Sequence, residues 1–336
     1  FIEIGLYLYN FLMIFNCYSL RLALLVPIIF YFSPVCAESY PTKPITFVVT
    51  SSPGGGTDAM ARLLAEIMSN DLGQPIVIEN IAGAGGAVGA GLVSRAKPDG
   101  YKILFTTGSF IIAPLLLPNA GYDPLMQFEG VRQLATVPLV VAAKGNDPMN
   151  SLADFIASSK RGSSLSFGSF GVGTPSHIAG EAINYFSGSN FTHIPYGGSS
   201  KVYPDLQSGI LSLGILDASF AVPMINQGAL KGLAVTGSRR LASLPNVPTL
   251  VELGIPFDLV GWYGVLVPKG TPNDVMLKLR QAFDAALLKP SVKERIREAG
   301  LGYVDGTLSP KQWTNKYQEE MHQWGELIKK VKITKD

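Results

Sequence analysis

The sequence predicts an α/β fold in which two lobes, each with a largely parallel sheet, face each other across a cleft. Strand-like and helix-like segments alternate along the chain after residue 37. Two glycine-rich turns, at 50–59 and 168–175, each connect a short apolar strand to an amphipathic helix. Because open α/β sheets bind ligands at the carboxyl ends of their strands, both turns are expected to face one cleft.

Composition narrows the class of protein and its partners. The 336 residues are 47% hydrophobic and 15% charged, which suits one large or two medium globular domains. The formal net charge is +2 and no run of like charges occurs. Neither nucleic acid nor an anionic membrane surface is therefore expected as a partner.

Residues 1–37 are expected to form a signal peptide that is removed when the protein is exported. An apolar segment at 22–32 follows Arg21, and Val35 and Ala37 fit the −3 and −1 positions of a signal-peptidase site, with cleavage after Ala37. An N-terminal membrane anchor is the alternative, and Arg21 counts against it because it falls inside the span. The leader predicts export to a bacterial periplasm.

The start of the chain and its cysteines both bear on this leader. The chain begins with Phe1, whereas Met13 gives a conventional leader length, so residues 1–12 fit upstream sequence translated in error. Cys17 and Cys36 both lie within the leader. The mature protein is therefore expected to contain no disulfide, thiolate metal site or cysteine nucleophile.

The remaining chain divides into strands and helices by the period of its apolar residues. Short apolar runs are expected as strands, and amphipathic segments that follow Ser, Thr or Pro as helices. The strands are expected at 45–49, 76–79, 101–106, 134–144, 165–167, 192–195, 209–216, 230–236 and 262–268. The helices are expected at 59–72, 87–96, 151–160 and 176–187, and onward from 271 and from 309.

The first glycine-rich turn is the most informative segment. Thr57 or Asp58 is expected to be the N-cap of its helix, with an ion pair between Arg62 and Glu66 on the exposed face. Several backbone N–H groups and the positive end of the helix dipole then point at one place. This predicts an anion site without a basic side chain, which a side chain at Gly55 would block. The alternative is a βα turn that binds nothing.

Other patterns that suggest chemistry fail on their spacing. The glycines of 83–91 look like a dinucleotide fingerprint, but Val88 stands where the third small residue is required. No Walker A sequence and no Gly-x-Ser-x-Gly elbow occurs. His177, His193 and His322 are scattered, and no histidine and carboxylate cluster shows metal-ligand spacing. Neither a metal nor a cofactor is expected.

Two polar residues have two interpretations each. His177, near the start of the helix after the second glycine-rich turn, either contacts a ligand or packs in the interior. Asp217 ends an apolar strand, and it either contacts a polar or cationic ligand group in the cleft or caps the next segment. Because no nucleophile stands beside a base, the sequence favours reversible binding of a small anion over catalysis.

Several motifs occur in an order that is specific in combination. They are Pro53-Gly-Gly-Gly-Thr-Asp58, Gly83-Ala-Gly-Gly86, Lys97-Pro-Asp-Gly-Tyr101, Gly168-Ser-Phe-Gly-Val-Gly-Thr-Pro-Ser-His177, Ile194-Pro-Tyr-Gly-Gly198, Leu244-Pro-Asn-Val-Pro-Thr249, Gly261-Trp-Tyr-Gly264 and Glu320-Met-His-Gln-Trp324. Over residues 38–330 the chain resembles the tripartite tricarboxylate transporter substrate-binding proteins, also called the Bug receptors.

The resemblance implies a two-lobed periplasmic binding protein of a type II-like flytrap form, with strands that cross between the lobes. Lobe 1 is placed at 38–141 plus 264–336, and lobe 2 at 142–263. Members of that family close on a small carboxylate. The turns of the first lobe hold one carboxylate, partly through ordered waters, and the second lobe selects the rest of the ligand.

The resemblance also implies which residues face the ligand. Ser51 departs from the family, which usually places an aromatic residue there, so the identity of the ligand does not carry over from relatives. The implied residues are Ser51, Ser52, Pro53, Gly54, Gly55, Thr57, Asp58, Thr107, Gly108 and Ser109 from the first lobe, Ser169, Gly171, Gly173, Thr174 and His177 from the second, and Tyr196 and Asp217 nearby.

The expected function is that of a monomeric extracytoplasmic receptor, not an enzyme. It would bind a small organic carboxylate and dock onto the membrane subunits of a tripartite tricarboxylate-type transporter, as the resemblance implies. One alternative is a receptor that feeds a sensor. The other is a periplasmic hydrolase or lyase on the same scaffold, which needs a base near Ser169 or Thr174, where only His177 is available.

Overall fold

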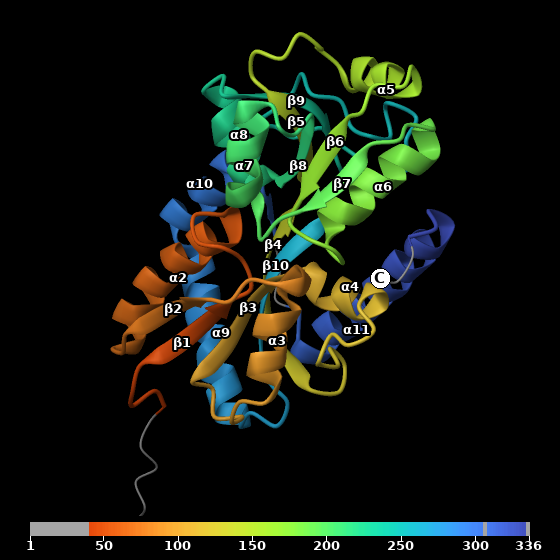
Figure 1. The fold of residues 1–336 in the computed structure, drawn as a ribbon. Coiled ribbons are helices and arrows are strands. Elements are labelled where there is room, and N and C mark those ends of the chain that lie inside the picture. The colour runs from red at the N-terminus through yellow and green to blue at the C-terminus, as the bar shows by residue number, and fades with distance from the viewer. Residues whose placement is uncertain (1–39, 305–307, 334–336) are drawn as a thin grey trace, which may run out of the picture. The chain divides into compact units, whose positions relative to one another are not determined.

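The computed structural model describes residues 40–304 and 308–333, which form two β-sheets flanked by helices (Figure 1). The predicted signal peptide, with its cleavage site and both cysteines, lies outside the described residues. The two-sheet α/β fold confirms the predicted fold class. Within the described part of the chain, none of the helices combines the length and apolar character of a membrane span.

The first sheet has six strands in the order β11-β4-β10-β3-β1-β2. Its strands are β1 (Ile45–Val49), β2 (Ile76–Asn80), β3 (Lys102–Thr107), β4 (Phe128–Val137), β10 (Gly261–Pro268) and β11 (Gly302–Tyr303). Strands β1, β2 and β3 are parallel, while β10 runs antiparallel between β3 and β4. Its helices are α2 (Gly56–Leu72), α3 (Ala87–Ser94), α4 (Ser109–Leu116), α9 (Asn273–Leu288), α10 (Pro290–Glu298) and α11 (Pro310–Lys330).

The second sheet has five strands in the order β7-β6-β8-β5-β9 and lies in the upper half of Figure 1. Its strands are β5 (Leu139–Lys144), β6 (Ser166–Ser169), β7 (Thr192–Pro195), β8 (Leu213–Asp217) and β9 (Leu230–Val235), and its helices are α5 (Leu152–Lys160), α6 (Pro175–Ser187), α7 (Ser199–Ser208) and α8 (Ala218–Asn226). Strand β6 is parallel to β7 and β8, but β5 is antiparallel to β8 and β9. Both sheets are thus mixed, not largely parallel as predicted.

The chain passes between the sheets at Pro138. A single strand was expected at 134–144, but β4 and β5 are separate strands in different sheets. Proline lacks the N–H that a continuous ladder needs, so the pairing breaks there. The chain returns to the first sheet between β9 and β10. The lobe limits 38–141 plus 264–336 and 142–263 stay a prediction beside these changes of sheet.

The returning strand β10 is buried along its whole length. Trp313 of α11 packs on it: a Cβ at Gly264 would come within 2.6 Å of the Trp313 ring, and one at Gly130 of β4 within 2.3 Å. Trp262 meets the Trp313 ring edge to face, with centroids 5.7 Å apart. The C-terminal helix therefore holds the strand that carries Trp262 and Tyr263 to the space between the sheets.

Candidate functional site

A cavity of about 50 Å³ lies between the two sheets. Its first-lobe walls include residues of the first glycine-rich turn and of β10, and its second-lobe walls come from the segments before α6, α7 and α8. A single water needs roughly 10–15 Å³, so there is room for more than one polar atom. Val137, Leu139, Phe170 and Trp262 supply apolar surface.

Six helices begin at this cavity. The first-lobe helices α2, α3 and α4 start at or just after Gly55, Gly86 and Gly108, all of which line it. The second-lobe helices α6, α7 and α8 start after lining residues at positions 174, 198 and 217. Because the first N–H groups of a helix have no intrahelical acceptor, the cavity collects backbone donors and the positive ends of helix dipoles.

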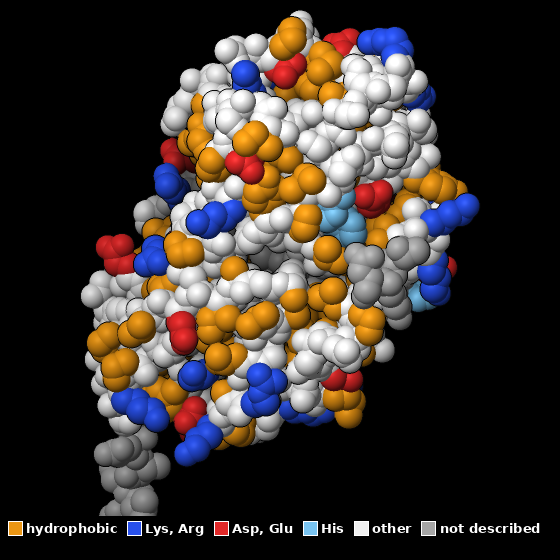
Figure 2. Space-filling view, viewed as in Figure 1, with side chains coloured by type: hydrophobic (Ala, Val, Ile, Leu, Met, Phe, Trp, Pro, Cys, Tyr) orange, Lys and Arg blue, Asp and Glu red, His pale blue; other side chains and the backbone are white. Residues whose placement is uncertain are grey.

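The residues that line the cavity include no lysine, arginine or histidine, and Asp217 is their only charged side chain. Figure 2 shows the hollow between the lobes surrounded largely by white atoms, which are backbone and uncharged polar side chains. Any attraction of this wall for an anion would therefore come from backbone N–H groups, helix dipoles and hydroxyl groups.

Asp217 is buried and its carboxylate is surrounded by donors. Its Oδ2 accepts from Ser199 Oγ at 2.5 Å, and its Oδ1 accepts from Phe220 N at 3.0 Å and from the Ser219 hydroxyl. The Tyr263 hydroxyl lies 3.3 Å from Oδ1. Asp217 caps α8, as one interpretation predicted, and it also lines the cavity. Its contact with a ligand group stays a prediction.

The Tyr263 hydroxyl joins this network from strand β10 of the first sheet. It lies 2.9 Å from Ser219 Oγ. Burial, and then the adjacent Asp217 charge, raises the pKa of Tyr263 well above its ordinary value, so the hydroxyl keeps its proton. The contact ties β10 to the start of α8 across the cavity.

Further hydrogen bonds join the first glycine-rich turn to the second lobe. Ser52 donates its N–H (3.2 Å) and its hydroxyl (3.0 Å) to the Gly197 carbonyl. Ser200 Oγ donates to the Pro53 carbonyl at 3.1 Å. The two lobes therefore touch across the cleft, and these residues hold the lobes together beside the cavity.

Asp58 supports the first turn from behind. Helix α2 begins at Gly56 with Gly55 as its N-cap, so Thr57 and Asp58 both lie in its first turn and neither is the N-cap that the sequence predicted. Its Oδ2 accepts from Gly54 N and from Arg62 Nε, each at 2.9 Å, and its Oδ1 accepts from Asn80 Nδ2 at 2.9 Å. Arg62 thus pairs with Asp58 instead of Glu66. A carboxylate in the first turn of a helix is stabilised by the helix dipole and can accept from the N–H groups of the preceding turn. Asp58 takes this position, and Arg62 pairs with it there.

These contacts predict a pH dependence of stability. Burial opposes ionisation of Asp58, but the Arg62, Gly54 and Asn80 hydrogen bonds outweigh it and lower its pKa below 3.8. A carboxyl group whose pKa is lower in the folded state than in the unfolded state stabilises the fold at pH values above its unfolded-state pKa. That contribution is lost as the pH falls through the folded-state pKa. Urea denaturation should therefore show a shallower loss of stability below pH 3.8 in Asp58→Asn than in the wild type. Parallel curves would contradict this role.

The structure brings about half of the predicted site residues to the cavity wall. The hydroxyl of Ser51 is buried there without a hydrogen-bond partner, which marks it as a group that a ligand would satisfy. The predicted residues that line the cavity are Ser51, Gly55, Thr57, Thr107, Gly108, Ser109, Thr174 and Asp217.

The other predicted residues lie behind or beside the wall. In the first lobe, Ser52, Pro53, Gly54 and Asp58 make the contacts described above. In the second, Gly171 and Gly173 face the first lobe, where added Cβ atoms would come within 3.7 Å of Gly85 N and 3.0 Å of Ala113 Cα. Tyr196 donates its hydroxyl to Asp205 Oδ2 at 2.5 Å. A ligand contact of these residues stays a prediction.

Ser169 and His177 also lie outside the cavity wall, and both pack near His193. Ser169 is fully buried, and its Oγ lies 2.6 Å from His193 Nε2. The base beside Ser169 is therefore His193, not His177 as the hydrolase alternative assumed. His177 is buried and stacks on the His193 ring, which agrees with the packing interpretation.

Sequence reasoning missed several wall residues. Gly83, Gly85 and Gly86 line the cavity, although this glycine run was considered only as a nucleotide motif and as one of the family motifs, and not as part of the site. Gly198 and Ser199 line it as well, because Tyr196-Gly-Gly198 turns directly into α7, a helix that apolar periodicity did not reveal. The signal that was available is a glycine pair directly before a serine-rich helix start.

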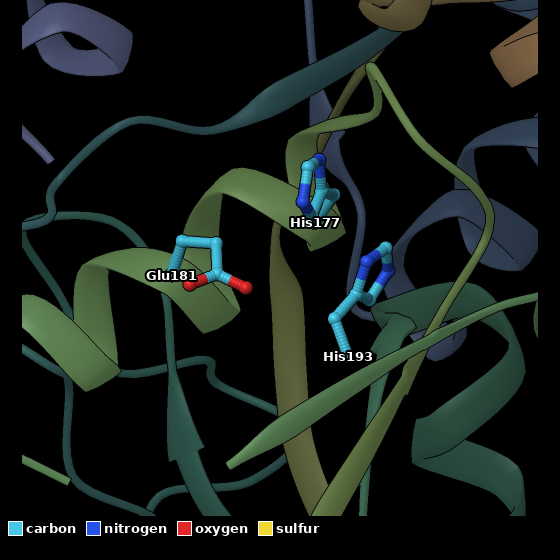
Figure 3. Close-up of side chains that lie close together, drawn as sticks. All are labelled: His177, Glu181 and His193. Carbon is cyan, nitrogen blue, oxygen red and sulfur yellow. The ribbon is translucent and has the colours of Figure 1, made fainter. Parts of the chain in front are cut away.

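The prediction that no histidine and carboxylate cluster has metal-ligand spacing is wrong. His177 and Glu181 lie one helical turn apart on α6, and Figure 3 shows them beside His193 of β7. Each offers a ligand atom, and these atoms lie within 4.8 Å of one another. The spacing of His177 and Glu181 was visible in the sequence, but the position of His193 depends on the pairing of β6 with β7.

The chain matches the family model described as "Tripartite tricarboxylate transporter family receptor" over residues 60–333. It is 33% identical to the protein BugT of Bordetella pertussis over 306 residues, 89% of this chain and 92% of BugT. Among solved structures it is similar to the periplasmic binding protein BugD, with 35% identity, a TM-score of 0.85, and coverage of 88% of this chain and all of BugD. An R. palustris protein solved with adipate shows 30% identity and a TM-score of 0.83, over 88% of this chain and 99% of that one.

Proposed function

The chain belongs to the family of tripartite tricarboxylate transporter receptors, and from this premise we propose that it binds a small organic carboxylate. It is a receptor, like the proteins it resembles, and not an enzyme. A relative of the same fold was solved with adipate, a dicarboxylate, which supports this class of ligand. We propose that the protein acts in the periplasm and delivers the bound carboxylate to the membrane subunits of a transporter.

The observation that carries the proposal is the convergence of helix N-termini on one cavity. A carboxylate at this place accepts hydrogen bonds from backbone N–H groups and lies at the positive ends of the helix dipoles. Such a site attracts an anion without the help of a basic side chain, because the backbone supplies part of the electrostatic attraction. The unpartnered Ser51 hydroxyl supplies one further polar contact.

The second lobe bears on the remainder of the ligand. Asp217 presents a carboxylate whose oxygens already accept from several donors, and Phe170 and Val137 add apolar surface. A ligand with an uncharged or hydroxyl-bearing distal part fits this wall better than one with a second unshielded charge next to Asp217.

A thermal-shift screen tests the proposal. The protein is heated with mono-, di- and tricarboxylates, aromatic acids and amino acids, each paired with its neutral amide. At about 100 times its Kd, a true ligand should add roughly 2.7 kcal/mol of stability, a rise of several degrees in Tm. The amide of the same acid should give little or no rise. Equal shifts for acid and amide, or none for any acid, would overturn the proposal.

A further inference from the structure

The second lobe carries a cluster of three potential metal ligands that the carboxylate site does not use. His177 and Glu181 project from the same face of α6, and His193 comes from β7 beside it (Figure 3). Their ligand atoms lie within 4.8 Å of one another. Because none of the three side chains lines the ligand cavity, the cluster requires an explanation of its own.

We propose that His177, Glu181 and His193 form a binding site for a divalent transition-metal ion of the zinc class. Two imidazoles and one carboxylate are a ligand set that suits Zn²⁺ and leaves a fourth position for water. This proposal does not depend on the identity of the carboxylate ligand or on the binding of one.

Glu181 contributes the anionic ligand of the set. Its Oε2 accepts a hydrogen bond from Asn184 Nδ2 at 3.4 Å. A carboxylate oxygen has further lone pairs, so this contact leaves acceptor capacity for a cation.

His193 is held in place by a second contact, a common feature of metal-binding histidines. Ser169 Oγ lies 2.6 Å from His193 Nε2, and the same Oγ accepts from Gly171 N at 3.0 Å. Ser169 is fully buried at the end of β6. It therefore acts as a positioning residue that fixes the His193 ring.

The three ligand atoms must move closer together, and two of the rings must tilt, before an ion can bind. Tetrahedral zinc with bonds of about 2.0–2.1 Å places its ligand atoms roughly 3.3 Å apart, so the present separations must shrink by roughly 1.5 Å at most. The His177 and His193 rings are stacked, with centroids 4.2 Å apart and planes at 19°. Each ring binds a metal in its own plane, so ion binding requires the two rings to tilt out of this stack.

The cluster is open to ions from solvent and close to the carboxylate site. Glu181 and His193 are half-buried, so each keeps part of its surface in contact with solvent. His177 lies one turn from Thr174, the N-cap of α6, which lines the cavity. A bound ion would therefore join α6 to β7 directly behind one wall of the carboxylate site.

The test is a titration of the untagged, metal-stripped protein with ZnCl₂, followed by calorimetry, without any carboxylate. One saturable Zn²⁺ site per chain is expected. His177→Ala and His193→Ala should each weaken it by more than roughly 100-fold, and Ser169→Ala by about 10- to 100-fold. The matched control is His322→Ala, because His322 is an exposed histidine on α11. The Zn²⁺ affinity of this variant should equal that of the wild type.

A second measurement needs no variant and so holds even if one fails to fold. Zn²⁺ added to the wild type should shift the NMR ring signals of His177 and His193 and leave those of His322 in place. Co²⁺ should give the intense visible absorption of a tetrahedral site. The proposal is overturned if no saturable site is found, if His322→Ala removes it, or if binding leaves the rings of His177 and His193 unchanged.

Discussion

Gly56→Ala is expected to weaken binding of the best carboxylate from the screen by roughly 100-fold or more, about 2.7 kcal/mol. Gly56 is the first residue of α2 and lines the cavity. A Cβ there would come within 1.7 Å of Ser219 Oγ, 2.3 Å of Asp217 Oδ1 and 2.6 Å of Tyr263 Oη. Ser219 and Asp217 belong to the second lobe, so the added methyl group acts mainly against contact between the lobes.

Gly55→Ala is the matched control for this experiment. A Cβ at Gly55 meets only the Ser52 carbonyl oxygen, at 3.6 Å, which is ordinary van der Waals contact. The loss of affinity should therefore be smaller for Gly55→Ala than for Gly56→Ala, as measured by calorimetry. That a side chain at Gly55 blocks the approach of the anion stays a prediction, and the structure adds a tight contact with the second lobe one residue later. Similar affinities for the two variants would show that contact between the lobes does not limit binding.

Asp217→Ala should reduce the free energy of unfolding by about 3 kcal/mol. The change removes the N-cap of α8, worth about 1 kcal/mol. It also leaves the hydroxyl donors of Ser199 and Ser219 without their acceptor, each at a cost of about 1–3 kcal/mol that neighbouring groups partly recover. Urea denaturation measures the loss, and a value below about 1 kcal/mol would contradict it.

Asp217→Asn separates the charge of this side chain from its hydrogen bonds. Asparagine is as good an N-cap as aspartate, and its amide can still accept from Phe220 N, so stability should change by less than about 1 kcal/mol. Removal of the negative charge should shift preference toward ligands with a second carboxylate by about 10-fold, or 1.4 kcal/mol. Identical ligand profiles for wild type and Asp217→Asn would show that the charge does not face the ligand.

Much of the architecture could be predicted from local pattern alone. The strands at 45–49, 192–195 and 230–236 were found within a residue or two, because short apolar runs between turn residues identify buried strands. The helices α4, α7, α8 and α10 were missed. Helices α4, α7 and α8 each contain an internal proline, Pro114, Pro204 and Pro223, which local rules treat as a break.

The candidate site was predictable where its chemistry is local. Ser51, Thr57 and Thr174 belong to glycine-rich turns at helix starts, and the structure places them on the cavity wall. Ser52 belongs to the first of these turns and Tyr196 to the glycine turn before α7, but their hydrogen bonds run to Gly197 and Asp205. Which face of a turn a side chain takes depends on the partner across the cleft, and the sequence of the turn does not contain that partner.

By itself, then, the sequence determined the α/β class, the two anion-type turns and the receptor family, because strand, turn and helix signals act over a few residues. Only the tertiary structure decided that six helix N-termini meet at one cavity, that Gly56 and not Gly55 lies against the second lobe, and that His193 joins His177 and Glu181. These relations join residues far apart in the chain. Strand pairing, and the two places where the chain crosses between the sheets, at Pro138 and before β10, determine these relations. The apolar periodicity of a single segment contains no information about strand pairing or about the crossings.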